Sequence, residues 1–165
     1  MKKKTILKAI RKPPKPSYLL STVDINSVLT QYQNEDFYFL GVTPLDGYKN
    51  WSKYLKPIKK YRYLAIVINT DTHEKPGKHW VAFFIDYEDK KIFYFDSLQN
   101  PMPKEMGKYI DIFSKKLGKL NGQYKITKVQ KDDINCGLHV IHFIVSQLRK
   151  TKKSPTRSMY FSSTS

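Results

Sequence analysis

Residues 79–96 read HWVAFFIDYEDKKIFYFD, and this stretch predicts the centre of a β-sheet. Two runs of β-branched and aromatic residues, His79–Asp86 and Lys91–Asp96, are joined by the polar residues 87–90. Such runs, bounded by polar turn residues, are typical of buried strands. We therefore predict an antiparallel pair in which His79 opens the first strand and Asp96 ends the second. Side chains near facing strand ends can meet across the ladder.

Helices and further strands are predicted on both sides of this pair. The upstream elements are a helix at Ser21–Gln33, capped by Ser21 or Asp24, a short apolar segment at Phe37–Leu40 that ends at Gly41, and a buried strand at Tyr61–Asn69. The downstream elements are an amphipathic helix at Lys104–Leu120, a strand at Gln123–Val129 and an apolar helix at Cys136–Leu148. This order predicts an α+β fold.

The length of 165 residues suits one domain with a core of its own. We predict a Lys- and Pro-rich flexible arm at 1–17, a folded domain at 18–150 and a polar tail at 151–165. The longest apolar runs, such as Val81–Ile85, are too short to cross a membrane. The basic N-terminus lacks the apolar core of a signal peptide, so we expect a protein that is not secreted and does not act at a membrane.

The chain is strongly basic, with 30 Lys and Arg against 14 Asp and Glu and a net charge of +16. Much of the excess lies at the two ends, at Lys2, Lys3, Lys4, Lys8, Arg11, Lys12, Lys15, Arg149, Lys150, Lys152, Lys153 and Arg157. Such a balance predicts salt-dependent affinity for polyanions, above all nucleic acid. The alternative is that the charge serves solubility alone.

Cys136 is the only cysteine, so the chain can form no internal disulfide. A lone cysteine is most often an inert packing residue, and its neighbours must supply any argument for reactivity. Cys136 begins a predicted helix, where unpaired backbone N–H groups and the helix dipole favour a thiolate. Gly137 leaves room for an approaching peptide, and Asn135 tolerates turn geometry.

His79, Asp96 and Gln130 complete a possible catalytic set. A carboxylate that accepts the imidazole N–H selects the tautomer of the ring and stabilises its charged form. Gln130 could direct its amide at a developing oxyanion, together with the backbone N–H of Cys136, and losing one such donor typically costs about 2.7–4 kcal/mol. Each residue alone is more often structural. The set, in the order His, Asp, Gln, Cys, predicts thiol-dependent hydrolysis.

The other histidines admit a different interpretation. Cys136, His139 and His142 recur at three-residue steps, as in some metal sites, but these positions do not share one helix face. We therefore predict no metal site, and expect His139 and His142 to pack against the core. His73, in a polar loop, is expected to be exposed.

Four segments resemble adenain, the maturation protease of adenoviruses. They are FYFLGVTPLDGY at Phe37–Tyr48, AIVINTDTHEKPGKHWVAFF at Ala65–Phe84, YFDS at Tyr94–Ser97 and QKDDINCGLHV at Gln130–Val140. The gaps of 17 residues from His79 to Asp96 and of six from Gln130 to Cys136 also match the wider clan, which includes the proteases specific for ubiquitin-like proteins.

This resemblance implies roles for individual residues. Cys136 would be the nucleophile, His79 the general base, Asp96 its partner and Gln130 an oxyanion donor, with Trp80 flanking the site. It also implies a small mixed β-sheet packed between helices, with the Cys-bearing helix central. It further implies that no cofactor is required and that substrates carry Gly near the scissile bond.

Two features depart from adenain. Adenoviral enzymes use Glu where this chain has Asp96, and they carry further cysteines, one of which binds an activating peptide through a disulfide. With Cys136 alone, that covalent activation is excluded. DNA or a non-covalently bound peptide stays open as an activator.

Three functional classes follow. The first is a monomeric viral protease that cleaves capsid or core precursors in the virion and at the host-cell site of assembly. The second is an isopeptidase of the deubiquitinating or deSUMOylating type. The third, and least favoured, is a basic nucleic-acid-binding protein without catalysis.

Overall fold

A computed structural model of the chain describes residues 20–55, 58–75, 79–124 and 136–152. Within these ranges, five strands form one sheet in the order β1-β2-β3-β4-β5. Their bounds are Phe37–Thr43 for β1, Tyr63–Asn69 for β2, Trp80–Asp86 for β3, Lys91–Phe95 for β4 and Asn121–Tyr124 for β5. The central three strands are antiparallel, while β1 and β5 pair in parallel with their neighbours. The predicted mixed sheet and α+β class are confirmed.

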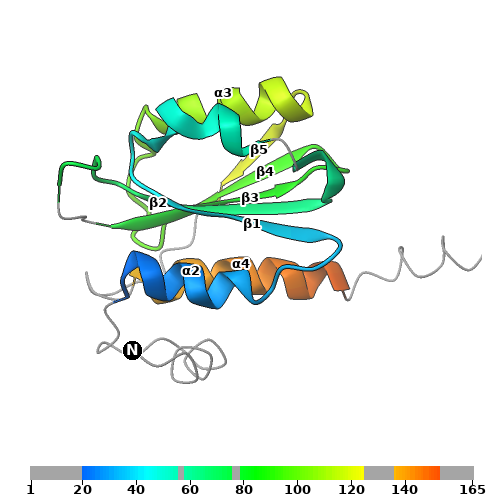
Figure 1. The fold of residues 1–165 in the computed structure, drawn as a ribbon, viewed down its shortest axis with the longest axis horizontal. Coiled ribbons are helices and arrows are strands. Elements are labelled where there is room, and N and C mark those ends of the chain that lie inside the picture. The colour runs from blue at the N-terminus through cyan, green and yellow to red at the C-terminus, as the bar shows by residue number, and fades with distance from the viewer. Residues whose placement is uncertain (1–19, 56–57, 76–78, 125–135, 153–165) are drawn as a thin grey trace, which may run out of the picture.

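Helices cover both faces of this sheet (Figure 1). Helices α2 (Thr22–Thr30) and α4 (Cys136–Lys152) lie against one face, and α3 (Met106–Leu117) lies against the other. Two short 3-10 helices, η1 (Gly47–Tyr54) and η2 (Ile58–Lys60), connect β1 to β2. None of the helices in the described ranges combines the length and the apolar composition needed to cross a bilayer.

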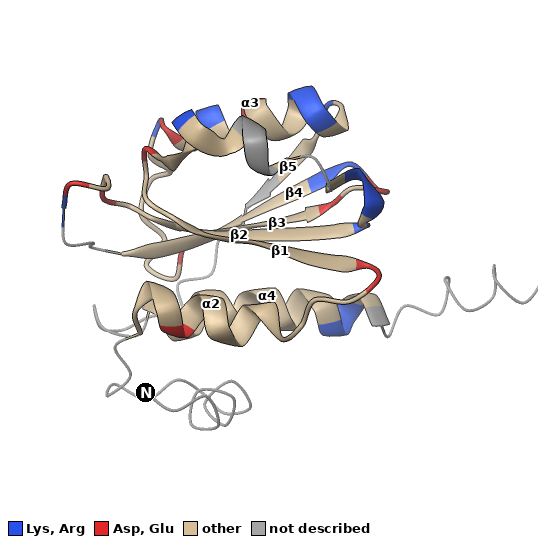
Figure 2. Ribbon diagram, viewed as in Figure 1, with Lys and Arg blue, Asp and Glu red and all other residues tan. Residues whose placement is uncertain are grey.

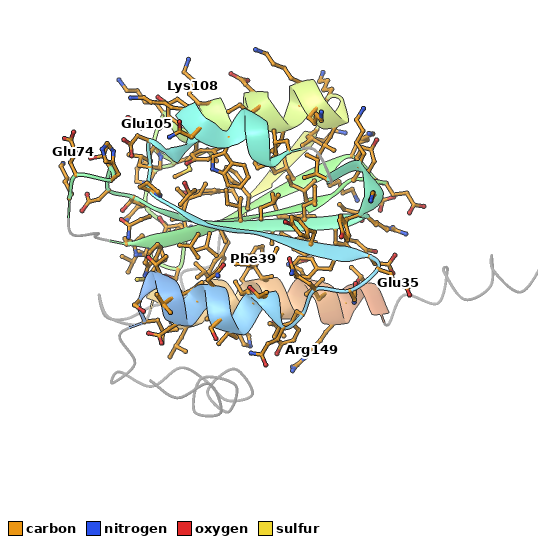
Figure 3. All side chains as sticks on the ribbon, viewed as in Figure 1. Glu35, Phe39, Glu74, Glu105, Lys108 and Arg149 are labelled. Atoms are coloured by element: carbon orange, nitrogen blue, oxygen red, sulfur yellow. The ribbon has the colours of Figure 1, made fainter. Side chains whose placement is uncertain are left out.

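The side chains of strand β2 contribute to two hydrophobic cores, one on each face of the sheet. All seven of its residues are buried, and alternate side chains enter opposite layers. Ala65 and Val67 pack in the α2 and α4 layer, whereas Leu64 and Ile66 pack in the α3 layer. In Figure 3, Phe39 points into the α2 and α4 layer, while Lys108 and Arg149 project from the outer helix surfaces.

The start of α2 follows from a capping box. The Ser21 hydroxyl accepts a hydrogen bond from the Asp24 N–H at 3.2 Å, and the Asp24 carboxylate accepts one from the Ser21 N–H at 2.9 Å. These bonds satisfy N–H groups that a helix start leaves unpaired. Of the two predicted caps, Ser21 is the one that the structure uses.

Several predicted bounds were wrong. Strand β1 continues past Gly41, because Gly41 adopts φ +114° and absorbs a bulge in the register with β2. Helix α3 is shorter than predicted and ends at Gly118, which adopts φ +88°. Strand β5 begins two residues before the predicted start, and the rest of the predicted strand lies outside the described residues. Helix α4 continues to Lys152, and η1 was not predicted at all.

Charges of both signs are interspersed over the described surface (Figure 2). Arg62, for example, pairs with Asp86 at 3.4 Å and with Glu88 at 2.8 Å. Of the terminal basic residues named above, only Arg149, Lys150 and Lys152 belong to the described ranges. The predicted arm at 1–17 lies outside them, as does the predicted tail beyond Lys152.

Candidate active site

The ends of three elements converge at one edge of the sheet. His79 directly precedes β3, Asp96 directly follows β4, and Cys136 is the first residue of α4. The antiparallel register pairs Ala82 with Phe95, which places the residues beyond both strand ends close together. Nε2 of the His79 ring lies 2.6 Å from Oδ1 of Asp96, and both side chains are buried. A carboxylate can only accept, so the ring donates this bond.

The turn after β4 holds the Asp96 carboxylate in place. Oδ1 of Asp96 also accepts a hydrogen bond from the Leu98 N–H at 2.9 Å. The Gln99 N–H donates to the Asp96 carbonyl at 3.1 Å, and Gln99 adopts φ 60°. With one oxygen bound to both the ring and the backbone, the carboxylate cannot rotate freely away from His79.

Helix α4 brings Cys136 to the same histidine. The Phe143 ring of α4 stacks on Phe95, with centroids 4.6 Å apart, and so anchors the helix beneath the end of β4. Cys136 is only 4% exposed, and its side chain shares a hydrogen bond with the His79 ring. Since Nε2 is bound to Asp96, Nδ1 is the ring nitrogen that remains for the sulfur.

The electrostatic balance at His79 favours the charged ring. Burial alone lowers the pKa of His79, but hydrogen bonds to Asp96 and Cys136 and the charges of both groups outweigh it. Together they raise the pKa of His79 from 6.5 to about 9. The ring is therefore protonated at neutral pH, and an imidazolium beside a thiol stabilises the thiolate.

Gly137 allows the first turn of α4 to pack closely. A Cβ at this position would lie 3.0 Å from Cβ of Leu20, 3.4 Å from Cδ1 of Trp80 and 3.5 Å from Cδ1 of Ile25. The absence of a side chain therefore has a packing reason, beside the predicted one of leaving space for a peptide. Trp80 contacts this turn and so flanks the site.

We expect Gly137→Ala to destabilise the fold by about 1–2 kcal/mol, because the Leu20 Cβ cannot swing aside and α4 must shift. Gly107→Ala is the matched control, since a Cβ at this α3 position meets nothing within 4 Å. In a helix that change should instead stabilise by about 0.5–1 kcal/mol. Urea unfolding of both variants isolates the cost of the clash. Equal free energies of unfolding for the two variants would contradict the close packing around Gly137.

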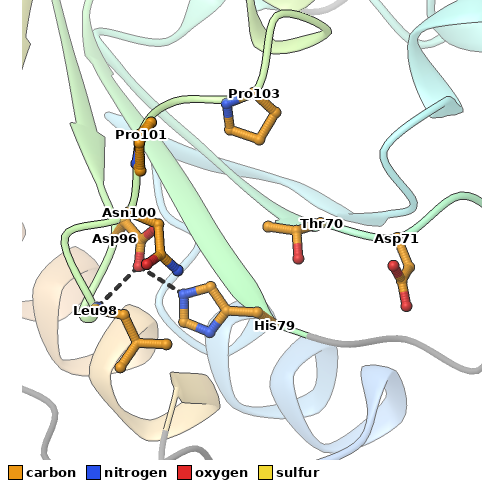
Figure 4. A pocket seen from close by; sticks show the side chains of 8 residues that line it. All are labelled: Thr70, Asp71, His79, Asp96, Leu98, Asn100, Pro101 and Pro103. Atoms are coloured by element: carbon orange, nitrogen blue, oxygen red, sulfur yellow. Dashed lines mark hydrogen bonds and ion pairs between the residues drawn. The ribbon is translucent and has the colours of Figure 1, made fainter.

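A cleft of about 480 Å³ lies beside the His79 ring. Its described lining consists of Thr70, Asp71, His79, Asp96, Leu98, Asn100, Pro101 and Pro103. Figure 4 shows His79 between two walls, with Thr70 and Asp71 on one side and Leu98, Asn100 and Pro101 on the other. Cys136 is not part of this lining. The cleft thus borders the His79 ring without bordering Cys136.

The structure brings His79, Asp96 and Cys136 together, but not every predicted residue can be placed. Gln130 and Asn135 lie outside the described residues, so their roles stay predictions. The cleft walls were missed, because their residues come from two loops without periodicity. The only available signals were the polar pair that follows β2 and the Pro-rich run at 97–103.

The predictions for the other histidines were partly confirmed and partly wrong. His73 is exposed, as predicted, and its Nδ1 lies 2.5 Å from Oδ2 of Asp46. The prediction of core packing was wrong for His142, which is exposed because α4 turns Ile141 and Val145 to the core instead. Although His142 is exposed, partial desolvation of its ring and the charge of Arg149 lower its pKa. Within the described ranges, no three His, Cys, Asp or Glu side chains are grouped to hold a metal.

Comparison with known proteins gives a consistent family. Residues 29–160 match the model of the Ulp1 protease family, C-terminal catalytic domain. A candidate thiol protease of Acanthamoeba polyphaga mimivirus is 32% identical over 152 residues, which are 82% of this chain and 50% of that protein. A cysteine protease of African swine fever virus is 32% identical over 89 residues, 50% of this chain and 33% of that protein. NEDD8-specific protease 1 of Schizosaccharomyces pombe is 30% identical over 118 residues, 66% and 27% of the two chains.

Solved structures agree on the fold. The African swine fever virus protease superposes with a TM-score of 0.64 at 20% identity, covering 79% of this chain and 57% of that one. The C-terminal Ulp1 protease domain, solved with the yeast ortholog of SUMO, superposes with a TM-score of 0.62 at 16% identity. The match covers 90% of this chain and 83% of that domain's chain. The chain spans half or less of the length of the curated relatives described above. On the family match, which covers most of its residues, the chain belongs to the Ulp1 protease family.

Proposed function

We propose that this chain is a cysteine protease in which Cys136 is the nucleophile, His79 the acid and base, and Asp96 the residue that positions the ring. One observation carries the proposal: a buried imidazole is bound to a carboxylate on one side and to a helix-terminal thiol on the other. This arrangement supplies a thiolate and a proton donor in contact with one another.

The reaction follows from these contacts. The Cys136 thiolate attacks the carbonyl carbon, and the carbonyl electrons move to oxygen. As the oxyanion collapses, the C–N bond breaks and the His79 imidazolium gives its proton to the leaving amine. Water then attacks the thioester while neutral His79 takes its proton, which releases the acid and restores the thiolate. Gln130 and the Cys136 N–H are the predicted oxyanion donors.

For the substrate, we propose a peptide or isopeptide bond that follows a glycine at the end of a ubiquitin-like protein. The family match supports this class, as does the relative named for NEDD8. The burial of Cys136 adds a physical reason, since a chain that reaches a thiol only 4% exposed must be narrow. Glycine, which has no side chain, fits such an approach best.

Processing of viral capsid or core precursors is the second candidate. The mimivirus and African swine fever virus relatives support it. In that case the enzyme would act in the virion and at the host-cell site of assembly, as the adenain resemblance suggests. Monomeric action, DNA binding through the basic ends, and activation by DNA or a non-covalent peptide are proposals of the same kind.

A panel of substrates separates the two candidates. Fluorogenic conjugates of several ubiquitin-like proteins are compared with short Gly-Gly-X peptides from capsid precursors, with Cys136→Ala as the blank. We expect the conjugates to be cleaved with the higher kcat/KM. Efficient cleavage of the capsid peptides alone would favour maturation, and no thiol-dependent cleavage of either set would contradict both.

The pH dependence of cleavage should reveal the charged ring. With the pKa of His79 raised to about 9, kcat/KM should stay level up to that pH and then fall about tenfold per unit as the proton donor is lost. In Asp96→Asn, this descending limb should move to lower pH, because the carboxylate that holds the proton is gone. An unmoved limb in the variant would assign it to another group.

The free energy of unfolding should also decline as the pH rises. A histidine whose pKa rises on folding stabilises the native state fully below its unfolded pKa of 6.5, and the effect is lost as the pH rises to about 9. Urea unfolding should therefore show a free energy that declines between these two values. The decline should be smaller in His79→Ala, and an equal decline there would contradict the assignment.

A further inference from the structure

We propose that the cleft beside His79 receives the part of the substrate that follows the scissile bond, and that Asp71 makes it prefer a basic side chain there. This inference rests on the proposed cysteine protease function. It adds a determinant of specificity on the leaving-group side.

The side of the cleft follows from the reaction. The attacked carbonyl carbon must contact the Cys136 sulfur, while the departing nitrogen must reach the His79 ring that protonates it. The cleft is lined by His79 and Asp96 but not by Cys136. The chain that begins at the departing nitrogen is therefore the part that continues into the cleft.

The two walls of the cleft differ in chemistry. Leu98, Pro101 and Pro103 make one side largely apolar, and Asn100 adds a neutral amide. The other side presents the Thr70 hydroxyl and the Asp71 carboxylate (Figure 4). Apart from the His79 ring, no described residue of the lining carries a positive charge. Among the described lining residues, a basic side chain in the cleft would thus meet the Asp71 carboxylate and, apart from the His79 ring, no cation.

Asp71 is the acid that remains available for this contact. The Asp96 carboxylate already accepts bonds from the His79 ring and the Leu98 N–H. By contrast, among the described residues no cation forms an ion pair with Asp71. Its half-buried side chain stands at the edge of the cleft, where a lysine or arginine can approach it from solvent.

The backbone holds Asp71 in position before any substrate binds. Its N–H donates to Oδ1 of Asn69 at 2.8 Å, and its carbonyl accepts from the Leu45 N–H at 2.9 Å. The adjacent Thr70 N–H donates to the His79 carbonyl at 2.8 Å. Because these bonds tie Asp71 to β2, to the loop before η1 and to His79, little order has to be gained on binding.

Quenched peptides with Gly-Gly before the scissile bond test the inference. They carry Lys, Gln or Glu at the first or the second position after the bond, because either side chain could be the one that reaches Asp71. For the intact chain we expect kcat/KM to fall from Lys to Gln to Glu at one of these positions, by about fivefold per step, as for a partly exposed ion pair. In Asp71→Asn, the ratio of Lys to Gln should fall close to one.

Glu74→Gln is the matched control. Glu74 lies on the same loop, is exposed and does not line the cleft (Figure 3). Its loss removes the same charge and a 3.9 Å contact with the exposed His73, and leaves the cleft lining unchanged. The Lys to Gln ratio should persist in this variant. An unchanged ratio in Asp71→Asn, or an equal drop in both variants, would overturn the inference but leave the protease function standing. Cleavage of ubiquitin-like conjugates without cleavage of any of these peptides would overturn the inference alone. If the intact chain cleaves neither the peptides nor the conjugates, the proposed function fails, and the inference fails with it.

Discussion

Replacing Cys136 with alanine is expected to lower kcat/KM by about 10⁵-fold or more, because the change removes the sulfur on which the acyl intermediate forms. The fold should survive the change. The side chain is buried but small, so the free energy of unfolding should fall by only about 1 kcal/mol. The two measurements are initial rates on a Gly-Gly peptide and urea unfolding of the same preparations.

Cys136→Ser is the control for this result. It keeps a polar group in place beside His79, but a hydroxyl is a far weaker nucleophile than a thiolate at neutral pH. Both variants should therefore be inactive and folded. Residual activity above a few per cent in either one would show that hydrolysis does not pass through the sulfur, and the assignment of the nucleophile would be wrong.

Asp96→Asn is expected to lower kcat by about 10⁴-fold, the loss seen when the acid of a catalytic triad becomes an amide. The Asp96 carboxylate accepts from both the ring and the Leu98 N–H, and it holds the proton on His79. An amide can turn its N–H₂ towards the ring, which selects the wrong tautomer and removes the attractive charge. The pKa of His79 should then fall, and the thiolate should lose its partner.

Asp86→Asn provides the matched control for this variant. Asp86 is also a buried acid of the β3–β4 hairpin, but it lies at the opposite end and pairs with Arg62 at 3.4 Å. Its replacement should lower stability and leave kcat nearly unchanged. A similar loss of kcat in both variants would mean that the hairpin as a whole, and not the Asp96 carboxylate, supports the reaction.

Much of the sheet could be predicted from local patterns. The runs at 63–69 and 80–86 are apolar at nearly every position, which is the signature of strands covered on both faces. The pairing of His79 with Asp96 could also be foreseen, because a short turn leaves antiparallel strand ends side by side. By contrast, the bulge at Gly41 and the end of α3 depend on backbone angles that composition indicates only weakly.

Helix phase explains the error at His142. The sequence marks α4 as apolar, but nearly every turn of it carries apolar residues in several directions, so the pattern does not show which side meets the sheet. In the structure, Ile141 and Val145 face the core and His142 points outward. The tertiary contacts of α4, such as the stacking of Phe143 on Phe95, set the rotation of the helix.

The sequence by itself determined the strands, the pairing of His79 with Asp96 and the chemistry of a thiol at a helix start, since each depends on residues that are near in the chain or on residue type alone. Only the tertiary structure decided that Cys136 reaches His79 and that Thr70 and Asp71 face Asn100 and Pro101 across a cleft. Those contacts join segments far apart in the chain. Their geometry comes from how closely the helix beginning at Cys136 packs against Leu20 and Ile25, and from how the loops after β2 and β4 are held.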